Sequence, residues 1–188
     1  MHYSPFALLD DDVIERASRV RLLCLAANGA LTDGRTLVDA DGRRQKAFHE
    51  TDARGLALLL EHGIQVAIIT TDATGIVAQW AKGTGIEVHA GIADKPASLR
   101  QLRLRRALAA DEVAYIGGDL PDLACMQGSG LAIAPADAHS LVAESAQWLT
   151  RAEAGHGAVR EACDGLLAAQ GRLVGILQDH ALKAEMPA

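Results

Sequence analysis

Five short apolar runs alternate with longer segments of helical periodicity along most of this sequence. The runs are continuous in hydrophobicity, which is typical of strands buried on both faces of a parallel sheet. Strands connected through helices predict an α/β fold, a doubly wound parallel sheet with right-handed crossovers. The expected strands are Val20–Ala26, Ile64–Thr71, Ile86–Ala90, Glu112–Gly118 and Gly130–Pro135, and the expected helices are Ala53–His62, Gly75–Lys82, Lys95–Ala109, Leu120–Gln127, Ser140–Ser145 and about Gly157–Gln170.

The segment of residues 35–49, "RTLVDADGRRQKAFH", breaks this alternation. Two short extended runs flank Asp41 and Gly42, and Asp-Gly is typical of a β-hairpin because glycine supplies the positive φ that the turn needs. A hairpin at this point would stand above the carboxyl end of the first strand, as a lid or as an interaction surface. The chain contains no internal repeat and no low-complexity linker. We therefore expect one domain over residues 1–188, with a core at about 20–173, the inserted hairpin and no large cap domain.

The charge and composition restrict the partners and the compartment. The 188 residues carry a formal net charge of −6, which argues against nucleic acid or an anionic membrane as the main partner. The basic run from Arg100 to Arg106 follows a helical pattern and is expected to be a solvated helix face. Three separated cysteines lack paired metal-ligand spacing and favour buried thiols in a reducing cytoplasm. No apolar segment reaches transmembrane length, and the first 20 residues lack the pattern of a secretory signal.

Ligands of doubly wound sheets bind outside the carboxyl ends of the strands. The expected strand ends are Ala26–Gly29, Thr70–Asp72, Ala90–Ile92, Gly117–Asp119 and Ala134–Asp137. The first of them carries Ala26, Ala27 and Asn28 instead of the carboxylates that a metal or a proton-transfer reaction would need.

Seven segments in order resemble the haloacid dehalogenase superfamily of phosphatases, and within it the cap-less 3-deoxy-D-manno-octulosonate 8-phosphate phosphatases. They are "GALTDG", "KAFHETDARGL", "VAIITT", "DKPASL", "YIGGDLPDL", "ADAH" and "GHGAVREACDGLLAAQG", and together they cover about residues 21–173. "GAVRE" followed by "LLAAQG" points to this subfamily. The resemblance implies a homotetramer whose hairpins join around a central axis and whose C-terminal tails reach neighbouring sites.

The same resemblance implies the family's chemistry. A first Asp attacks phosphorus, and a second Asp two residues later acts as general acid and base. Mg²⁺ is held by the first Asp, by the backbone carbonyl of the second, and by an Asp after the fourth strand. A Thr or Ser and a Lys bind the transferring phosphoryl group.

This sequence departs from that pattern at four positions. The nucleophile position is Ala26 and the acid–base position is Asn28. The primary metal-ligand position is Gly118, and Asp72 stands where the family has an Arg. The catalytic motifs are therefore degenerate, and we expect Mg²⁺, the cofactor of active relatives, to bind weakly or not at all.

The retained polar residues each have two interpretations. Thr70 either binds an oxyanion or caps the next helix. Lys95 either binds phosphate or forms a salt bridge with Asp119 or Asp72. Asp119 and Asp122 are either weak metal ligands or acidic residues at a helix N-terminus. His156 and Arg160 either enter a neighbouring subunit's pocket, as the resemblance implies, or belong to a loop and the start of a helix.

Three functions follow from these observations. The first is a catalytically impaired or inactive homologue that binds a sugar phosphate or serves as a regulatory or assembly subunit of an active paralogue. The alternative is a Mg²⁺-dependent phosphatase acting on a phosphorylated sugar acid with altered catalytic residues. The second alternative is a purely structural oligomer.

Overall fold

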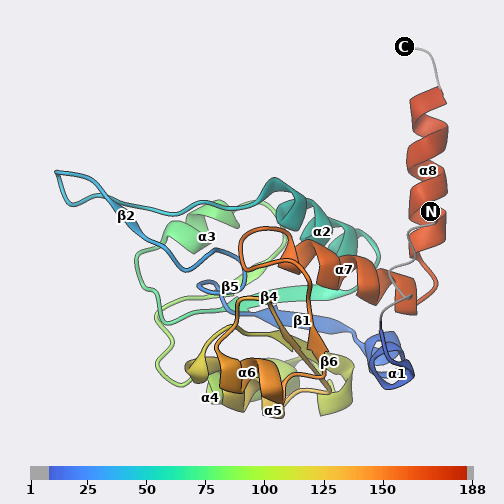
Figure 1. Cartoon of the computed structure of the whole chain (residues 1–188), viewed down its shortest axis with the longest axis horizontal. Coiled ribbons are helices and arrows are strands. Elements are labelled where there is room, and N and C mark those ends of the chain that lie inside the picture. Colours follow the sequence, from blue (N-terminus) through green and yellow to red (C-terminus); the bar gives the residue numbers. More distant parts are fainter. Residues whose placement is uncertain (1–8, 186–188) are drawn as a thin grey trace.

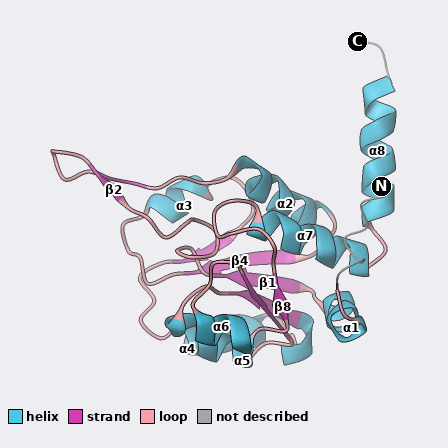
Figure 2. Ribbon diagram, viewed as in Figure 1, coloured by secondary structure: helices cyan, strands magenta, loops and turns pink. Residues whose placement is uncertain are grey.

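The fold is an α/β sandwich around a six-stranded parallel sheet. The structure is a computed structural model and describes residues 9–185. The strand order is β5-β4-β1-β6-β7-β8, and every neighbouring pair is parallel (Figures 1 and 2). The chain leaves β1 at the centre of the sheet and returns on both sides of it, which confirms the doubly wound topology. The strands are β1 Leu22–Leu25, β4 Gln65–Ile69, β5 Glu87–His89, β6 Val113–Ile116, β7 Leu131–Ala134 and β8 Trp148–Leu149.

Helices cover both faces of this sheet, as Figure 1 shows. The helices are α1 Asp11–Arg19, α2 Glu50–Glu61, α3 Ile76–Trp80, α4 Lys95–Arg105, α5 Leu123–Gln127, α6 Ser140–Ser145, α7 Ala158–Ala169 and α8 Leu173–Glu185, with short 3₁₀ turns η1 Ala110–Glu112 and η2 Leu120–Asp122. Side chains from α1, α2 and α7 pack against one face, and side chains from α4, α5 and α6 pack against the other. The two apolar layers therefore bury the central strands from both sides, as their continuous hydrophobicity predicts.

The inserted hairpin is present and lies where the sequence places it. Its strands β2 Leu37–Val38 and β3 Arg44–Gln45 are antiparallel, and Gly42 has the positive φ of 79° that the turn requires. Figure 1 shows the hairpin extending away from the sheet, beyond α3. At its base, Phe48 stacks on Trp80 with ring centroids 4.7 Å apart, which ties the returning arm to α3.

Three elements of the fold were not predicted from the sequence. Strand β8 has only two residues, too short for a periodic signal. Helix α1 buries only Val13 and Ala17, one turn apart, within a mostly charged segment. Helix α8 continues the chain beyond the expected end of the core and projects away from the body (Figure 1). Helix α4 ends at Arg105, earlier than expected, and the chain turns through Ala107 with a φ of 50°.

No helix among residues 9–185 is long and apolar enough to cross a membrane.

Candidate functional site

A cavity of about 150 Å³ opens at the carboxyl ends of β1, β4 and β6. Its lining brings together five residues singled out in the sequence: Asn28, Thr70, Lys95, Asp119 and Asp122, with Thr71 and Pro121 beside them. Strands β4 and β6 flank β1 on either side, so residues far apart in the chain meet at this edge. The cavity lies where doubly wound sheets bind ligands.

Ala26, at the end of β1, lies outside this cavity's lining. Its backbone N–H donates to the Ile116 carbonyl at 2.9 Å, which extends the ladder one residue beyond the strand. The residue is fully buried and packs in the apolar core. After Ala27 the chain turns back tightly, and the Thr32 N–H donates to the Ala27 carbonyl at 2.9 Å. Position 26 therefore offers a ligand neither a polar atom nor an exposed surface.

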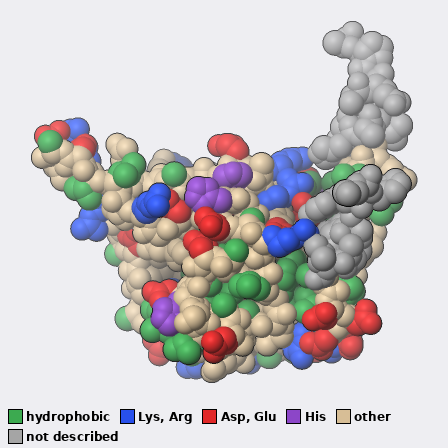
Figure 3. All heavy atoms as spheres, in the orientation of Figure 1, with side chains coloured by type: hydrophobic (Ala, Val, Ile, Leu, Met, Phe, Trp, Pro, Cys, Tyr) green, Lys and Arg blue, Asp and Glu red, His purple; other side chains and the backbone are tan. Residues whose placement is uncertain are grey.

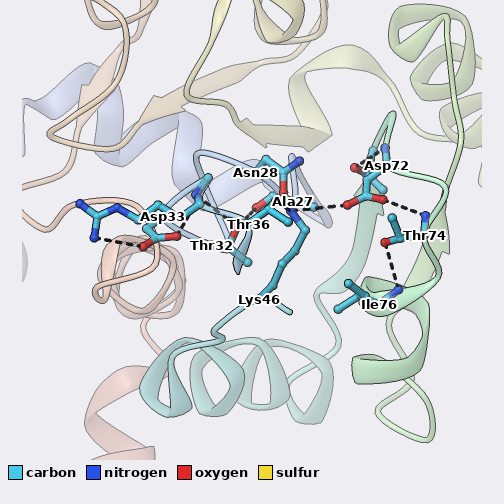
Figure 4. Close-up of polar contacts among 12 residues, drawn as sticks. Ala27, Asn28, Thr32, Asp33, Thr36, Lys46, Asp72, Thr74 and Ile76 are labelled. Atoms are coloured by element: carbon cyan, nitrogen blue, oxygen red, sulfur yellow. Dashed lines mark hydrogen bonds and ion pairs between the residues drawn. The ribbon is translucent and has the colours of Figure 1, made fainter. Parts of the chain in front are cut away.

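Lys46, on the returning arm of the hairpin, reaches into this turn (Figure 4). Its Nζ donates to Asn28 Oδ1 at 2.6 Å and to Thr36 Oγ1 at 3.4 Å, and lies 3.5 Å from Asp72 Oδ2. The Lys46 side chain is only 3% exposed, so the ammonium group is held among these oxygens largely away from solvent. The cation joins the ends of β1 and β4 through the hairpin.

Asp72 is the carboxylate in this cluster. Its Oδ1 accepts the Thr74 N–H at 2.8 Å, and its other oxygen faces Lys46. Partial burial acts to raise the pKa of Asp72, but hydrogen bonds from Thr74 and the charge of Lys46 outweigh it, so the pKa lies below its ordinary value. Asp72 is therefore charged at neutral pH and balances Lys46.

Asp122 organises the opposite wall of the cavity. Its Oδ1 accepts from Lys95 Nζ at 2.8 Å and from the Tyr115 hydroxyl at 3.1 Å, and its Oδ2 accepts the N–H groups of Gly118 and Asp119 at 3.2 and 3.4 Å. Burial and the charge of Asp122 raise the pKa of Tyr115 well above its ordinary value, which keeps its hydroxyl a donor. All four acceptor positions of this buried carboxylate are thus occupied.

The partner of Lys95 corrects the expectation from the sequence. Its salt bridge is with Asp122, whereas Asp119 or Asp72 was expected. Asp119 instead caps η2, accepting the Leu120 N–H at 2.8 Å. The helix-terminus interpretation of Asp119 and Asp122 agrees with these contacts.

Thr70 caps a turn and not a helix. It is 2% exposed, and its Oγ1 accepts the Asp72 N–H at 3.1 Å, whereas α3 begins only at Ile76, after Gly75. The expected helix cap is therefore wrong. The hydroxyl hydrogen is still free to turn toward the cavity that Thr70 lines.

Gly118 is a glycine for steric reasons. A Cβ at this position would lie 1.9 Å from the Gly29 carbonyl oxygen, far inside van der Waals contact. The turn after β1 therefore occupies the space that any side chain at position 118 would need. A carboxylate there would require the turn to move.

His156 and Arg160 lie away from this cavity and line a separate hollow of about 480 Å³ at the start of α7. Arg160 is engaged within its own chain, with Nε donating to both carboxylate oxygens of Asp164 at 2.8 and 2.9 Å. Its backbone N–H donates to Asp52 Oδ1 at 2.7 Å. Entry of these residues into a neighbouring subunit stays a prediction.

Asp52, which the sequence analysis did not single out, is the other fully buried carboxylate. Its Oδ2 is the one buried side-chain oxygen or nitrogen without a hydrogen-bond partner in the described part of the chain. Burial raises the pKa of Asp52, and the N–H groups of Arg160 and Gly157 offset this only in part. Asp52 joins α2 to the start of α7.

The residues at the sheet edge do not fit Mg²⁺, which requires about six oxygen ligands in octahedral geometry. Ala26 has no donor atom, Asn28 Oδ1 contacts an ammonium group, and the acceptor positions of Asp122 are filled. Asp119, on the exposed rim, is the other carboxylate of the cavity lining. Among residues 9–185, no group of three or more His, Cys, Asp or Glu side chains is placed to hold a metal ion.

Lys46 is the main residue that the sequence analysis missed. It begins the segment "KAFHETDARGL" and lies 18 residues from Asn28 in the chain. A signal existed in the sequence, because Asp72 at a strand end needs a cation and Lys46 follows a hairpin that must return over that edge.

Comparisons with known proteins agree with this architecture. The chain is 39% identical over 174 residues to 3-deoxy-D-manno-octulosonate 8-phosphate phosphatase KdsC of Yersinia pestis, covering 92% of this chain and 91% of the relative. A hypothetical protein of Xanthomonas campestris, XCC2798, superposes with a TM-score of 0.92 at 43% identity, covering 95% of this chain and 98% of that one. No family model matches the sequence.

A third protein was solved with ligands. The 3-deoxy-D-manno-octulosonate 8-phosphate phosphatase of Moraxella catarrhalis, in complex with magnesium ion, phosphate ion and a KDO molecule, superposes with a TM-score of 0.88 at 30% identity, covering 90% of this chain and 98% of that one. The parallel sheet, the inserted hairpin and the similarity over nearly the whole length lead to one conclusion. The chain belongs to the 3-deoxy-D-manno-octulosonate 8-phosphate phosphatase family of the haloacid dehalogenase superfamily.

Proposed function

We propose that this protein binds the phosphate group of a phosphorylated sugar acid without hydrolysing it by the family's aspartate mechanism. One observation carries the proposal: the end of β1 presents the buried methyl group of Ala26 and the amide of Asn28, held by Lys46. A methyl group cannot attack phosphorus. An amide cannot exchange a proton in the pH range where a general acid and base must work.

Other hydroxyl groups near the cavity do not supply a nucleophile in the described structure. Thr32 is fully buried, and its Oγ1 donates to the Ala27 carbonyl. Thr70 and Thr71 line the cavity and Thr70 accepts the Asp72 N–H, but no histidine lines the cavity to act as a base for either hydroxyl. The geometry therefore supports binding of an oxyanion better than covalent catalysis.

A phosphate-release assay tests the proposal. Purified protein is incubated with 3-deoxy-D-manno-octulosonate 8-phosphate and MgCl₂, beside an identical sample containing EDTA. We expect no release above the enzyme-free blank in either sample. Turnover that EDTA abolishes would overturn the proposal.

Restoring the carboxylates is a complementary experiment. Ala26→Asp with Asn28→Asp returns the nucleophile and the acid–base group, but Gly118→Asp collides with the Gly29 carbonyl unless the turn moves. We expect the double variant to remain inactive and the triple variant to lose stability. Activity in the double variant would show that position 118 is dispensable.

A second candidate is a Mg²⁺-dependent phosphatase acting on a phosphorylated sugar acid with altered catalytic residues. It is favoured by similarity alone, because a curated phosphatase shares 39% identity over 92% of this chain. The same assay separates the two candidates. A binding protein gives a thermal shift with the sugar phosphate and no release, whereas a phosphatase gives release.

We also propose that the hairpin is an assembly surface of a homotetramer. Leu37 and Val38, in β2, are 64% and 62% exposed, and Figure 3 shows apolar and charged side chains together at the end of the hairpin. Light scattering of wild type and of Leu37→Asp with Val38→Asp tests this. We expect a tetramer that dissociates in the double variant, and a monomeric wild type would refute it.

The three buried free thiols support a reducing compartment such as the cytoplasm.

A further inference from the structure

We propose that Lys46 is a built-in cation that takes the electrostatic role of the family's metal and turns Asn28 into an anion-binding donor, so that the cavity binds phosphate without a metal. This inference rests on the proposed function and names the chemistry of its binding site. It concerns this chain's own residues, whose arrangement excludes the family's metal.

The charges next to Asn28 balance without a divalent cation. A divalent cation needs carboxylates around it, and positions 26, 28 and 118 have none. On the side of Asn28 that faces the hairpin, the carboxylate of Asp72 lies opposite the ammonium group of Lys46. One positive charge balances one negative charge in this pair, so the surroundings of the Asn28 carbonyl oxygen are neutral without any added ion. A divalent cation would bring a net positive charge and compete with an ammonium group that is already coordinated.

The contact with Lys46 fixes the orientation of the Asn28 amide. An ammonium group can only donate hydrogen bonds, so the Asn28 atom 2.6 Å from Lys46 Nζ must be the carbonyl oxygen. The two N–H donors of the amide are consequently on the other side. Figure 4 shows Asn28 Nδ2 directed away from Lys46. An aspartate at this position would present only acceptors, whereas this amide presents two donors from a residue that lines the cavity.

Three residues of the cavity lining carry hydrogen-bond donors. Lys95 donates one of its three N–H groups to Asp122, which leaves two N–H groups for a ligand. Thr70 accepts the Asp72 N–H and keeps its own hydroxyl hydrogen. Together with Asn28 Nδ2, these residues give the roughly 150 Å³ cavity donors from the ends of β1 and β4 and from the start of α4. This combination suits a phosphate monoester or another small oxyanion.

In this arrangement Lys46 is a positioning residue. Its three donors are directed to Asn28, Thr36 and Asp72, so it acts on the ligand through the amide that it orients. Its removal should therefore weaken anion binding even though the ammonium itself does not touch the ligand.

The test is calorimetric titration of inorganic phosphate into the full chain, once in EDTA and once in MgCl₂. Three variants are compared with wild type: Asn28→Asp, Lys46→Met and the control Lys82→Met, which removes an exposed lysine outside the cavity. We expect the same dissociation constant with and without Mg²⁺. We expect a loss of about tenfold in Asn28→Asp and Lys46→Met, which corresponds to one charge-assisted hydrogen bond, and no change in Lys82→Met.

Three results would overturn the inference: phosphate binding that requires Mg²⁺, Asn28→Asp binding phosphate as tightly as wild type, or no phosphate binding in EDTA. Circular dichroism of each variant checks that it is folded. Asn28→Asp is isosteric and gains a salt bridge with Lys46, so this variant should fold. It therefore still tests the inference if Lys46→Met unfolds. The phosphate-release assay is separate. Release of phosphate in that assay would refute the proposed function, but the titration of phosphate could still be interpreted. Absence of phosphate binding in the titration would refute this inference without showing that the protein is a phosphatase.

Discussion

The two walls of the cavity are built in opposite ways. On the β6 wall, the buried Asp122 accepts from Lys95, from Tyr115 and from two backbone N–H groups, so every partner is satisfied within the fold. On the β1 wall, a tight turn with an apolar residue at its start is completed by Lys46, a side chain from the inserted hairpin. One wall is a closed polar network, and the other is a turn held by a distant cation.

The difference separates what the fold requires from what the chemistry requires. The Lys95–Asp122 pair connects α4, β6 and η2, so it has a structural role whether or not a ligand binds. On the β1 turn, the side chains at positions 26 and 28 are uncharged, and the buried ammonium group of Lys46 is balanced by Asp72, after the end of β4. Loss of the reactive carboxylates from this wall is therefore compatible with an intact fold. Four substitutions test this contrast between the two walls.

The largest effect is expected on the β6 wall, from Asp122→Ala. The change leaves Lys95 buried without its counter-charge and removes the acceptor of Tyr115. Breaking one side of a buried pair costs about 3–5 kcal/mol, and urea unfolding followed by circular dichroism measures it.

Asp119→Ala is the matched control, three residues away. Asp119 is exposed and caps the short 3₁₀ turn η2, so its loss should cost about 1 kcal/mol. Equal losses in the two variants would show that the Asp122 network does not hold this wall together.

Gly118→Ala tests where the two walls meet. The added methyl group would lie 1.9 Å from the Gly29 carbonyl oxygen, and overpacking of this kind costs about 1–3 kcal/mol. Unfolding free energies measure the effect. Gly175→Ala, whose added methyl group meets no atom within 4 Å, serves as the control. An unchanged free energy in Gly118→Ala would mean that the β1 turn yields easily, and that a side chain could be accommodated at position 118 after all.

The two walls also differ in how far they could be predicted from the sequence. The strands, their order of appearance and the residues at their ends follow from local apolar runs, so the meeting of Asn28, Thr70, Lys95, Asp119 and Asp122 was predictable. The partner of Lys95 was not, because Asp72, Asp119 and Asp122 all lie at strand ends. The choice among them depends on the path of the turn after β6, and Asp122 lies 27 residues from Lys95 in the chain.

Lys46 was harder still to predict. Its contact with Asn28 depends on the angle at which the hairpin leaves and returns to the sheet, and that angle is fixed partly by the stacking of Phe48 on Trp80. Neither property appears in local periodicity. Asp52 escaped notice for a related reason, since its burial results from the packing of α2 on α7, two segments about a hundred residues apart.

Lys46→Met tests whether the distant cation holds the β1 wall. The methionine keeps most of the apolar stem but loses the contacts with Asn28, Thr36 and Asp72. We expect the amides of residues 36–46 to exchange with deuterium about five- to tenfold faster, which corresponds to a local opening easier by about 1 kcal/mol. Amides of β6 should be unaffected. Uniformly faster exchange across the sheet would show that Lys46 supports the whole fold and not this wall alone.

The smallest effect is expected from Asp72→Asn, and its dependence on pH is the informative part. The pKa of Asp72 is lowered in the folded protein from its ordinary value of 3.8. Its carboxylate therefore stabilises the fold fully at pH values above 3.8, and this stabilisation is lost as the pH falls through the lowered pKa. The variant should therefore be less stable than wild type by about 1 kcal/mol or less at pH 7, and the difference should shrink to nothing in acid. Urea unfolding between pH 7 and pH 3 measures the slope, with the exposed Asp119→Asn as control. A difference that grows in acid would mean that Asp72 is not the counter-charge of Lys46, and the neutrality of the β1 wall would then need another source.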